Sequence, residues 1–64
     1  GRMMEEHMTP NEIKAYLDHA ITNWRGIRDE SKSGTRVYIE AVCYIDAYQS
    51  VRVTLFNEML PVVN

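Results

Sequence analysis

Few residues of a type that does chemistry occur in this 64-residue sequence, and none stands in a recognisable catalytic pattern. His19 has no nucleophile or carboxylate motif around it, and Cys43 is the only cysteine. An isolated cysteine is more often a small buried hydrophobe than a nucleophile. Residues 5–7 ("EEH") offer metal-ligand types, but they fall in an expected tail. There is no glycine-rich phosphate loop and no metalloprotease pattern. We therefore expect a protein that is not an enzyme and has no cofactor or metal.

A second candidate site is a basic cluster in the middle of the chain. It holds four of the seven basic residues, Arg25, Arg28, Lys32 and Arg36. Two copies of such a cluster in a dimer could meet phosphates. Asp29 and Glu30 dilute it, and a net charge of −2 with a pI near 5.5 argues against a surface built for nucleic acid. A small nucleic-acid-binding regulator is therefore the alternative function, not the preferred one.

A third candidate is the pair of polar residues, Gln49 and Arg52, inside the apolar stretch "AVCYIDAYQSVRVTLF". In the interpretation we prefer, the aliphatic part of the Arg52 side chain packs on the core and its guanidinium reaches outward to water. A second interpretation pairs Arg52 with a carboxylate across the fold. A third makes a small polar pocket, although no spacing demands a ligand. That pocket would consist of Tyr16, His19, Tyr48, Gln49 and Arg52.

The small size of the chain favours a fold that a partner chain completes. A chain of this length buries only about 60% of its unfolded surface, so its own core is marginal. Small scaffolds compensate with disulfides, a metal or partner chains. The single Cys43 excludes an internal disulfide, and no zinc-type spacing occurs. No apolar run approaches the roughly 20 residues of a membrane span, and no signal peptide is visible. We expect an oligomeric cytoplasmic protein that has no membrane partner.

The elements that would position these residues begin with a helix at residues 10–32. The sequence "TPNE" at Thr9–Glu12 is a capping box with a proline at the first helical position. Apolar residues then recur at spacings of three and four, which predicts one apolar stripe on an amphipathic helix. These residues are Ile13, Tyr16, Leu17, Ala20, Ile21, Trp24 and Ile27. Gly34 and Thr35 then predict a helix end and a new cap.

Residues 36–60 admit two structures. Their Val, Ile, Tyr and Thr content favours strands, and a β-hairpin with strands near 36–45 and 51–56 would give an α+β fold. However, the turn "DAYQS" lacks the Gly or Asn that tight hairpins prefer. No Gly or Pro occurs from Thr35 to Leu60, which favours one helix. We therefore predict an all-α fold, a two-helix antiparallel hairpin. Folding about Gly34 would place Arg52 near Tyr16 and Asp18.

As a helix, residues 36–60 present an apolar arc too wide for one partner helix, and it divides into two lobes. One lobe holds Tyr38, Val42, Ile45, Val53, Phe56 and Leu60. The other holds Val37, Ala41, Tyr44, Tyr48, Val51, Leu55 and Met59. We expect the first helix to cover one lobe and a second copy to cover the other, giving a homodimeric four-helix bundle. The predicted function is thus a small interaction or assembly module that self-associates, with a protein partner as a further option.

We divide the chain into three parts. Residues 1–8 form a flexible tail in which Gly1 and Arg2 resemble cloning residues, residues 9–61 form the helical hairpin domain, and residues 62–64 form a short tail.

Overall fold

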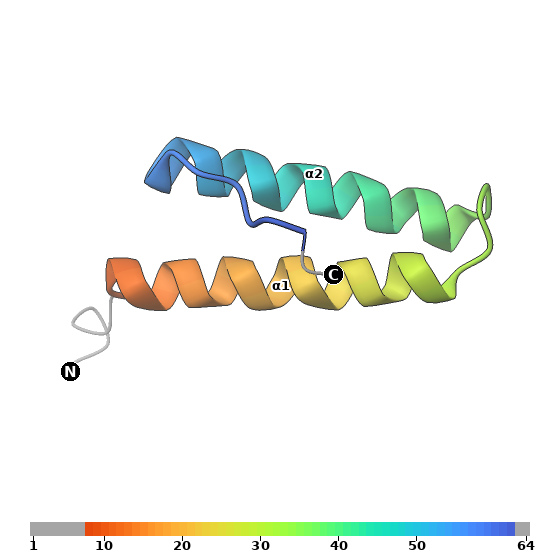
Figure 1. The fold of residues 1–64 in the computed structure, drawn as a ribbon, viewed down its shortest axis with the longest axis horizontal. Coiled ribbons are helices and arrows are strands. Elements are labelled where there is room, and N and C mark those ends of the chain that lie inside the picture. Colours follow the sequence, from red (N-terminus) through yellow and green to blue (C-terminus); the bar gives the residue numbers. More distant parts are fainter. Residues whose placement is uncertain (1–7, 63–64) are drawn as a thin grey trace.

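The protein is an antiparallel hairpin of two α-helices. The computed structural model describes residues 8–62, which form α1 (Pro10–Glu30) and α2 (Arg36–Phe56). After α2 the chain turns back and runs along one side of the hairpin (Figure 1). We call residues 57–62 the strap. The predicted all-α hairpin is confirmed, and the α+β alternative is wrong, since the described residues contain no strand.

The start of α1 is fixed by the predicted capping box. The backbone N–H of Thr9 donates to Glu12 Oε1 at 2.8 Å, and the N–H of Glu12 donates to Thr9 Oγ1 at 3.2 Å. The helix ends at Glu30, two residues before the predicted end. Ser31 takes an extended conformation there, and its N–H donates to the carbonyl of Arg28 at 3.2 Å.

The turn between the helices uses the two residues that the sequence indicated. Gly34 has φ +87°, a left-handed conformation that costs other residues energy because of their Cβ. Thr35 caps α2: its hydroxyl oxygen accepts from the N–H of Tyr38 at 3.3 Å and donates to the carbonyl of Lys32 at 2.7 Å. Such a short turn forces α2 to run antiparallel to α1.

The apolar core is thin. Its buried members are Leu17 and Ile21 from α1 and Ala41 and Ile45 from α2. Ala41 and Ile45 belong to different predicted lobes, so α1 packs on the seam between the lobes instead of covering one of them. This corrects the expected packing and leaves part of each lobe at the surface.

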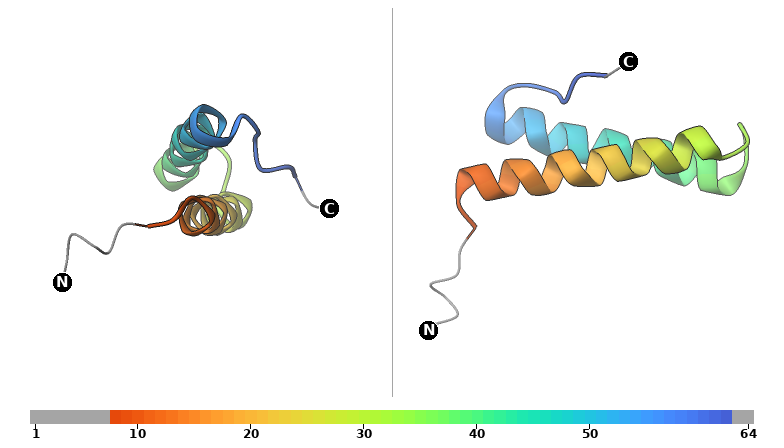
Figure 2. Two further views of the ribbon diagram at one scale, coloured as in Figure 1. Left: turned by 90° about the vertical axis from the view of Figure 1, so that its left-hand side faces the viewer. Right: turned by 60° about the horizontal axis from the view of Figure 1, so that its bottom comes forward.

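Helix α2 ends at Phe56, four residues before the predicted end. Asn57 adopts a left-handed conformation with φ 60°, and its N–H donates to the carbonyl of Val53 at 2.8 Å. Asparagine tolerates this conformation better than most residues do. The strap then leaves the helix axis and lies on one side of the plane that contains both helices (Figure 2).

Replacing glycine by alanine should have opposite effects on stability at the two glycines of the hairpin. Gly26 lies inside α1 with open space where a methyl group would stand, so Gly26→Ala should raise the free energy of unfolding by about 0.5–1 kcal/mol. Gly34→Ala should lower it by about 1 kcal/mol, because alanine disfavours a positive φ. Urea denaturation of both variants measures the difference. A stabilised Gly34→Ala variant would contradict the observed turn.

Candidate functional site

A buried arginine joins the three segments of the fold. Arg52 on α2 is only 3% exposed. Its Nε donates to Asp18 Oδ1 on α1 at 2.6 Å, and its Nη1 donates to the carbonyl of Glu58 in the strap at 2.8 Å. The hydrogen bond from Arg52 to Asp18 raises the pKa of Arg52 above its ordinary value, so the guanidinium stays charged. The interpretation that Arg52 reaches outward is therefore wrong, and the pairing with a carboxylate across the fold is confirmed.

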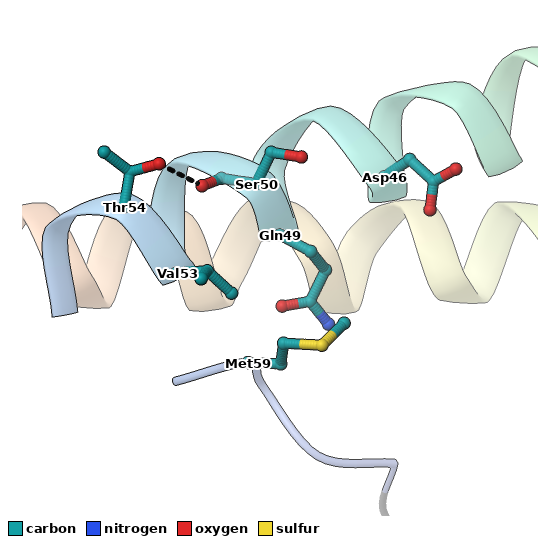
Figure 3. Close-up of a pocket in the computed structure, with 6 residues that line it drawn as sticks. All are labelled: Asp46, Gln49, Ser50, Val53, Thr54 and Met59. Carbon is teal, nitrogen blue, oxygen red and sulfur yellow. Dashed lines mark hydrogen bonds between the residues drawn. The ribbon is translucent and has the colours of Figure 1, made fainter. Parts of the chain in front are cut away.

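Gln49 binds the strap through both ends of its side-chain amide. Its Nε2 donates to the carbonyl of Leu60 at 3.0 Å, and its Oε1 accepts from the N–H of the same residue at 2.9 Å. Gln49 is 5% exposed, and its side chain extends from α2 toward the strap beside Met59 (Figure 3). A buried amide that bonds both backbone groups of one residue holds that residue in a single register.

Arg25 on α1 completes the attachment of the strap. Its Nη2 donates to the carbonyl of Leu60 and its Nη1 to the carbonyl of Pro61, both at 2.8 Å. The strap backbone is therefore held by Arg25, Gln49 and Arg52, one side chain from α1 and two from α2. We call the surface that these three side chains form the strap groove.

Side-chain contacts contribute less to holding the strap. Lys14 Nζ lies 3.0 Å from Glu58 Oε2, but both side chains are exposed, and such pairs contribute little. Leu60 is half-buried, whereas Met59 and Val62 are exposed. The strap is thus bound mainly through its backbone carbonyls and one N–H.

The predicted polar pocket is not assembled as one site. Gln49 and Arg52 do lie together, under the strap. Tyr16 and Tyr48 form an edge-to-face pair with ring centroids 6.4 Å apart. Tyr16 lies two residues before Asp18, so the two point to nearly opposite sides of α1. The Tyr16 hydroxyl raises the pKa of Tyr48 above its usual value, with a smaller contribution from burial. His19 is exposed.

The predicted basic cluster is largely engaged within the protein. Arg25 binds the strap, Arg28 Nε lies 3.0 Å from Asp29 Oδ1, and Arg36 Nε lies 3.6 Å from Glu40 Oε2. Lys32 is exposed in the turn. Arg25 and Arg28 line one depression together with Asp29, and the Arg36 side chain is 91% exposed.

An apolar stripe runs along α2. It consists of Val37, Tyr44, Tyr48, Val51 and Leu55, which are separated by seven, four, three and four residues and so share one side of the helix. Tyr48 is half-buried, and the other four are between 44% and 53% exposed. Five of the seven residues predicted for self-association therefore form this stripe. Of the other two, Ala41 is in the hairpin core and Met59 is on the strap.

Aromatic contacts attach the stripe to α1. Tyr44 stacks on Trp24 with ring centroids 4.5 Å apart and an interplanar angle of 19°. Tyr48 packs against Tyr16, which is 56% exposed and widens the apolar surface. Rings held in this way lose little side-chain freedom on binding a partner.

The described residues also include a depression beside the strap. A shallow depression between α2 and the strap is lined by Asp46, Gln49, Ser50, Val53, Thr54 and Met59 (Figure 3). It contains one carboxylate and no second titratable side chain. Within residues 8–62, no group of three His, Cys, Asp or Glu side chains is placed to hold a metal. The "EEH" sequence at residues 5–7, with Gly1 and Arg2, lies outside the described residues.

Comparison with known proteins gives this chain no relative, because no family model, curated protein or solved structure matches it. In the part of the chain that the structure describes, neither helix has the length and apolar character to cross a membrane. The function must therefore be inferred from the geometry above.

The half-buried ion pair of Asp18 and Arg52 predicts a loss of stability when it is broken. Asp18→Asn removes the nearer of two carboxylates that face Arg52 and leaves the buried guanidinium with that of Glu58, 3.9 Å away, so the melting temperature should fall by about 5 °C or more. Arg52→Met should also lower it, since the bonds to Asp18 and to the strap are both lost. Asp46→Asn, at an exposed position on α2, is the matched control and should change little. Equal melting temperatures for Asp18→Asn and the control would contradict a structural role for the pair.

Proposed function

We propose that this protein is a non-enzymatic interaction module that self-associates as a homodimer through the apolar stripe of α2. Two hairpins packed on this stripe would make a four-helix bundle with an isologous interface. The observation that carries the proposal is the stripe itself, a continuous row of half-exposed apolar and aromatic side chains. Single exposed hydrophobic residues are ordinary, whereas a continuous row on a small protein is typical of an interaction surface.

The arrangement of the stripe suits a twofold axis. Val37 and Leu55 stand near its two ends, about 27 Å apart along α2 at 1.5 Å per residue. In an antiparallel pair of α2 helices, Val37 of each copy would meet Leu55 of its partner. Tyr44 and Tyr48 would then lie near the axis, where each tyrosine can bury its ring and keep its hydroxyl hydrated. Tyrosine is enriched at the centre of protein interfaces for this reason.

The energetic case rests on the thinness of the core. Only four apolar residues of the described chain are buried, so the isolated hairpin has little hydrophobic stabilisation. An interface of standard size buries about 800 Å² per partner, roughly one sixth of the 4964 Å² surface of this protein. At about 25 cal/mol per Å², a few hundred Å² of apolar surface would contribute several kcal/mol. That gain is comparable to the whole stability of a small domain.

The alternative function, nucleic-acid binding through Arg25, Arg28, Lys32 and Arg36, has less support. Arg25 is committed to the strap, and Arg28 and Arg36 each have a carboxylate within 3.6 Å. Phosphate contacts would have to displace these partners.

Charged substitutions in the stripe should separate association from folding. Leu55→Asp and Val51→Asp place a carboxylate at exposed positions, so the monomer should remain helical while the dimer dissociates. Ser50→Asp, an exposed position off the stripe, is the control and should keep the wild-type association. Sedimentation across micromolar concentrations measures the assembly state, and circular dichroism checks helicity.

The wild-type protein should also show a melting temperature that rises with protein concentration, because folding and association are coupled. A wild-type chain that sediments as a concentration-independent monomer in the micromolar range would overturn the proposal.

A further inference from the structure

The strap is attached to the hairpin in a way that does not depend on its being part of the same chain. The hydrogen bonds to the backbone of residues 58–61 come from side chains of α1 or α2, namely Arg25, Gln49 and Arg52. The groove therefore binds the backbone of residues 58–61, and the covalent link contributes one further hydrogen bond, from the N–H of Asn57 to the carbonyl of Val53.

The strap is also a segment that can detach. It has one half-buried apolar side chain, Leu60, and its other side chains are exposed. Segments with so little buried apolar surface open at a small fraction of the global unfolding free energy. Asn57 joins α2 to the rest of the strap in a left-handed conformation, and rotation of its backbone would let the strap swing away. The sequence does not oppose that movement, because Glu58, Met59 and Leu60 are good helix formers.

We propose that the strap groove is a peptide-binding site that accepts residues 58–61 of a second copy, so that two copies exchange straps. The exchanged segment has the same sequence as the one seated in the groove, so it makes the same bonds, including the contact of Glu58 with Lys14. Exchange of identical segments between protomers changes few contacts and is a low-cost route to dimers. This site is separate from the apolar stripe and does not rest on it.

The covalent link between the strap and its own α2 determines when exchange between copies occurs. A strap joined to α2 through one residue has an effective concentration in the millimolar range or above, so the closed form dominates in dilute solution. Exchange becomes favourable where the closed form is impaired or where copies are concentrated. A test must therefore prevent each strap from binding the groove of its own chain. The mixture must still contain one chain with an intact strap and another with an intact groove.

Two full-length variants provide this test. Gln49→Leu keeps an intact strap but removes the side chain that binds both backbone groups of Leu60. Leu60→Pro keeps an intact groove but removes the N–H that donates to Gln49. Both are made in the Leu55→Asp background, which separates this contact from the stripe. Cys43 is the only cysteine and is exposed, so it carries a donor dye on one variant and an acceptor dye on the other.

We expect energy transfer when Gln49→Leu is mixed with Leu60→Pro, with an apparent affinity at least tenfold tighter than that of either variant for itself. A synthetic peptide of residues 57–62 should suppress the signal by occupying the free groove. If Gln49→Leu does not fold, Arg25→Gln replaces it, because it removes the bonds to Leu60 and Pro61 from a half-buried position. No transfer in the mixture above that of the single variants would overturn the inference. It would leave the stripe proposal standing, since that proposal is tested without these changes.

Discussion

The position of one charged group, the guanidinium of Arg52, determines how the remaining parts of this small protein are arranged. A buried cation is tolerated only when an anion and further acceptors surround it. Asp18 supplies the anion from α1, which fixes how far the two helices slide past each other. The carbonyl of Glu58 supplies a further acceptor, and it reaches Arg52 only because the chain leaves the helix after Phe56. Continuing α2 to residue 60 would carry that carbonyl away along the helix axis. The early end of α2 is thus a consequence of burying Arg52.

The same constraint gives the hairpin two different sides. On one side Arg25, Gln49 and Arg52 bind the strap, so the contact there is polar and directional. On the other side Tyr16 and Tyr48 meet edge to face, and the surface is apolar and aromatic. Helix α1 lies between them on the seam of α2, where the small side chain of Ala41 allows the helices to approach. The exposed polar side of α2 points away from α1 and holds Arg36, Glu40, Asp46, Ser50 and Thr54. The rest of the helix surface is therefore divided between the hairpin core, the strap contact and the apolar stripe.

Local signals in the sequence were sufficient to predict the two helices. They were insufficient to predict the strap and the side chains that bind it. The capping box at Thr9 and the Gly34–Thr35 pair act within a few residues, so the sequence places α1, the turn and the start of α2 correctly. The proximity of Arg52 to Asp18 also follows from folding about Gly34. The end of α2 could not be predicted, because Glu58, Met59 and Leu60 favour a helix, whereas the left-handed turn at Asn57 and tertiary bonds hold them out of one. The role of Arg25 was missed for the same reason, since its partners are backbone carbonyls that carry no side-chain signal.

The closed strap has a further consequence for assembly. A protein with two different binding sides can form open chains of copies, whereas one isologous surface closes as a dimer. When the strap lies in its groove, it satisfies Arg25, Gln49 and Arg52 and covers the polar side. The apolar stripe then remains free to join a second copy, and its proposed twofold pairing would bury both stripes. Asn57 has a left-handed conformation where the strap leaves α2. If the proposed stripe dimer forms, a strap kept within its own chain would limit that assembly to two copies. Control of assembly size would thus depend on one backbone conformation and the buried side chains that stabilise it.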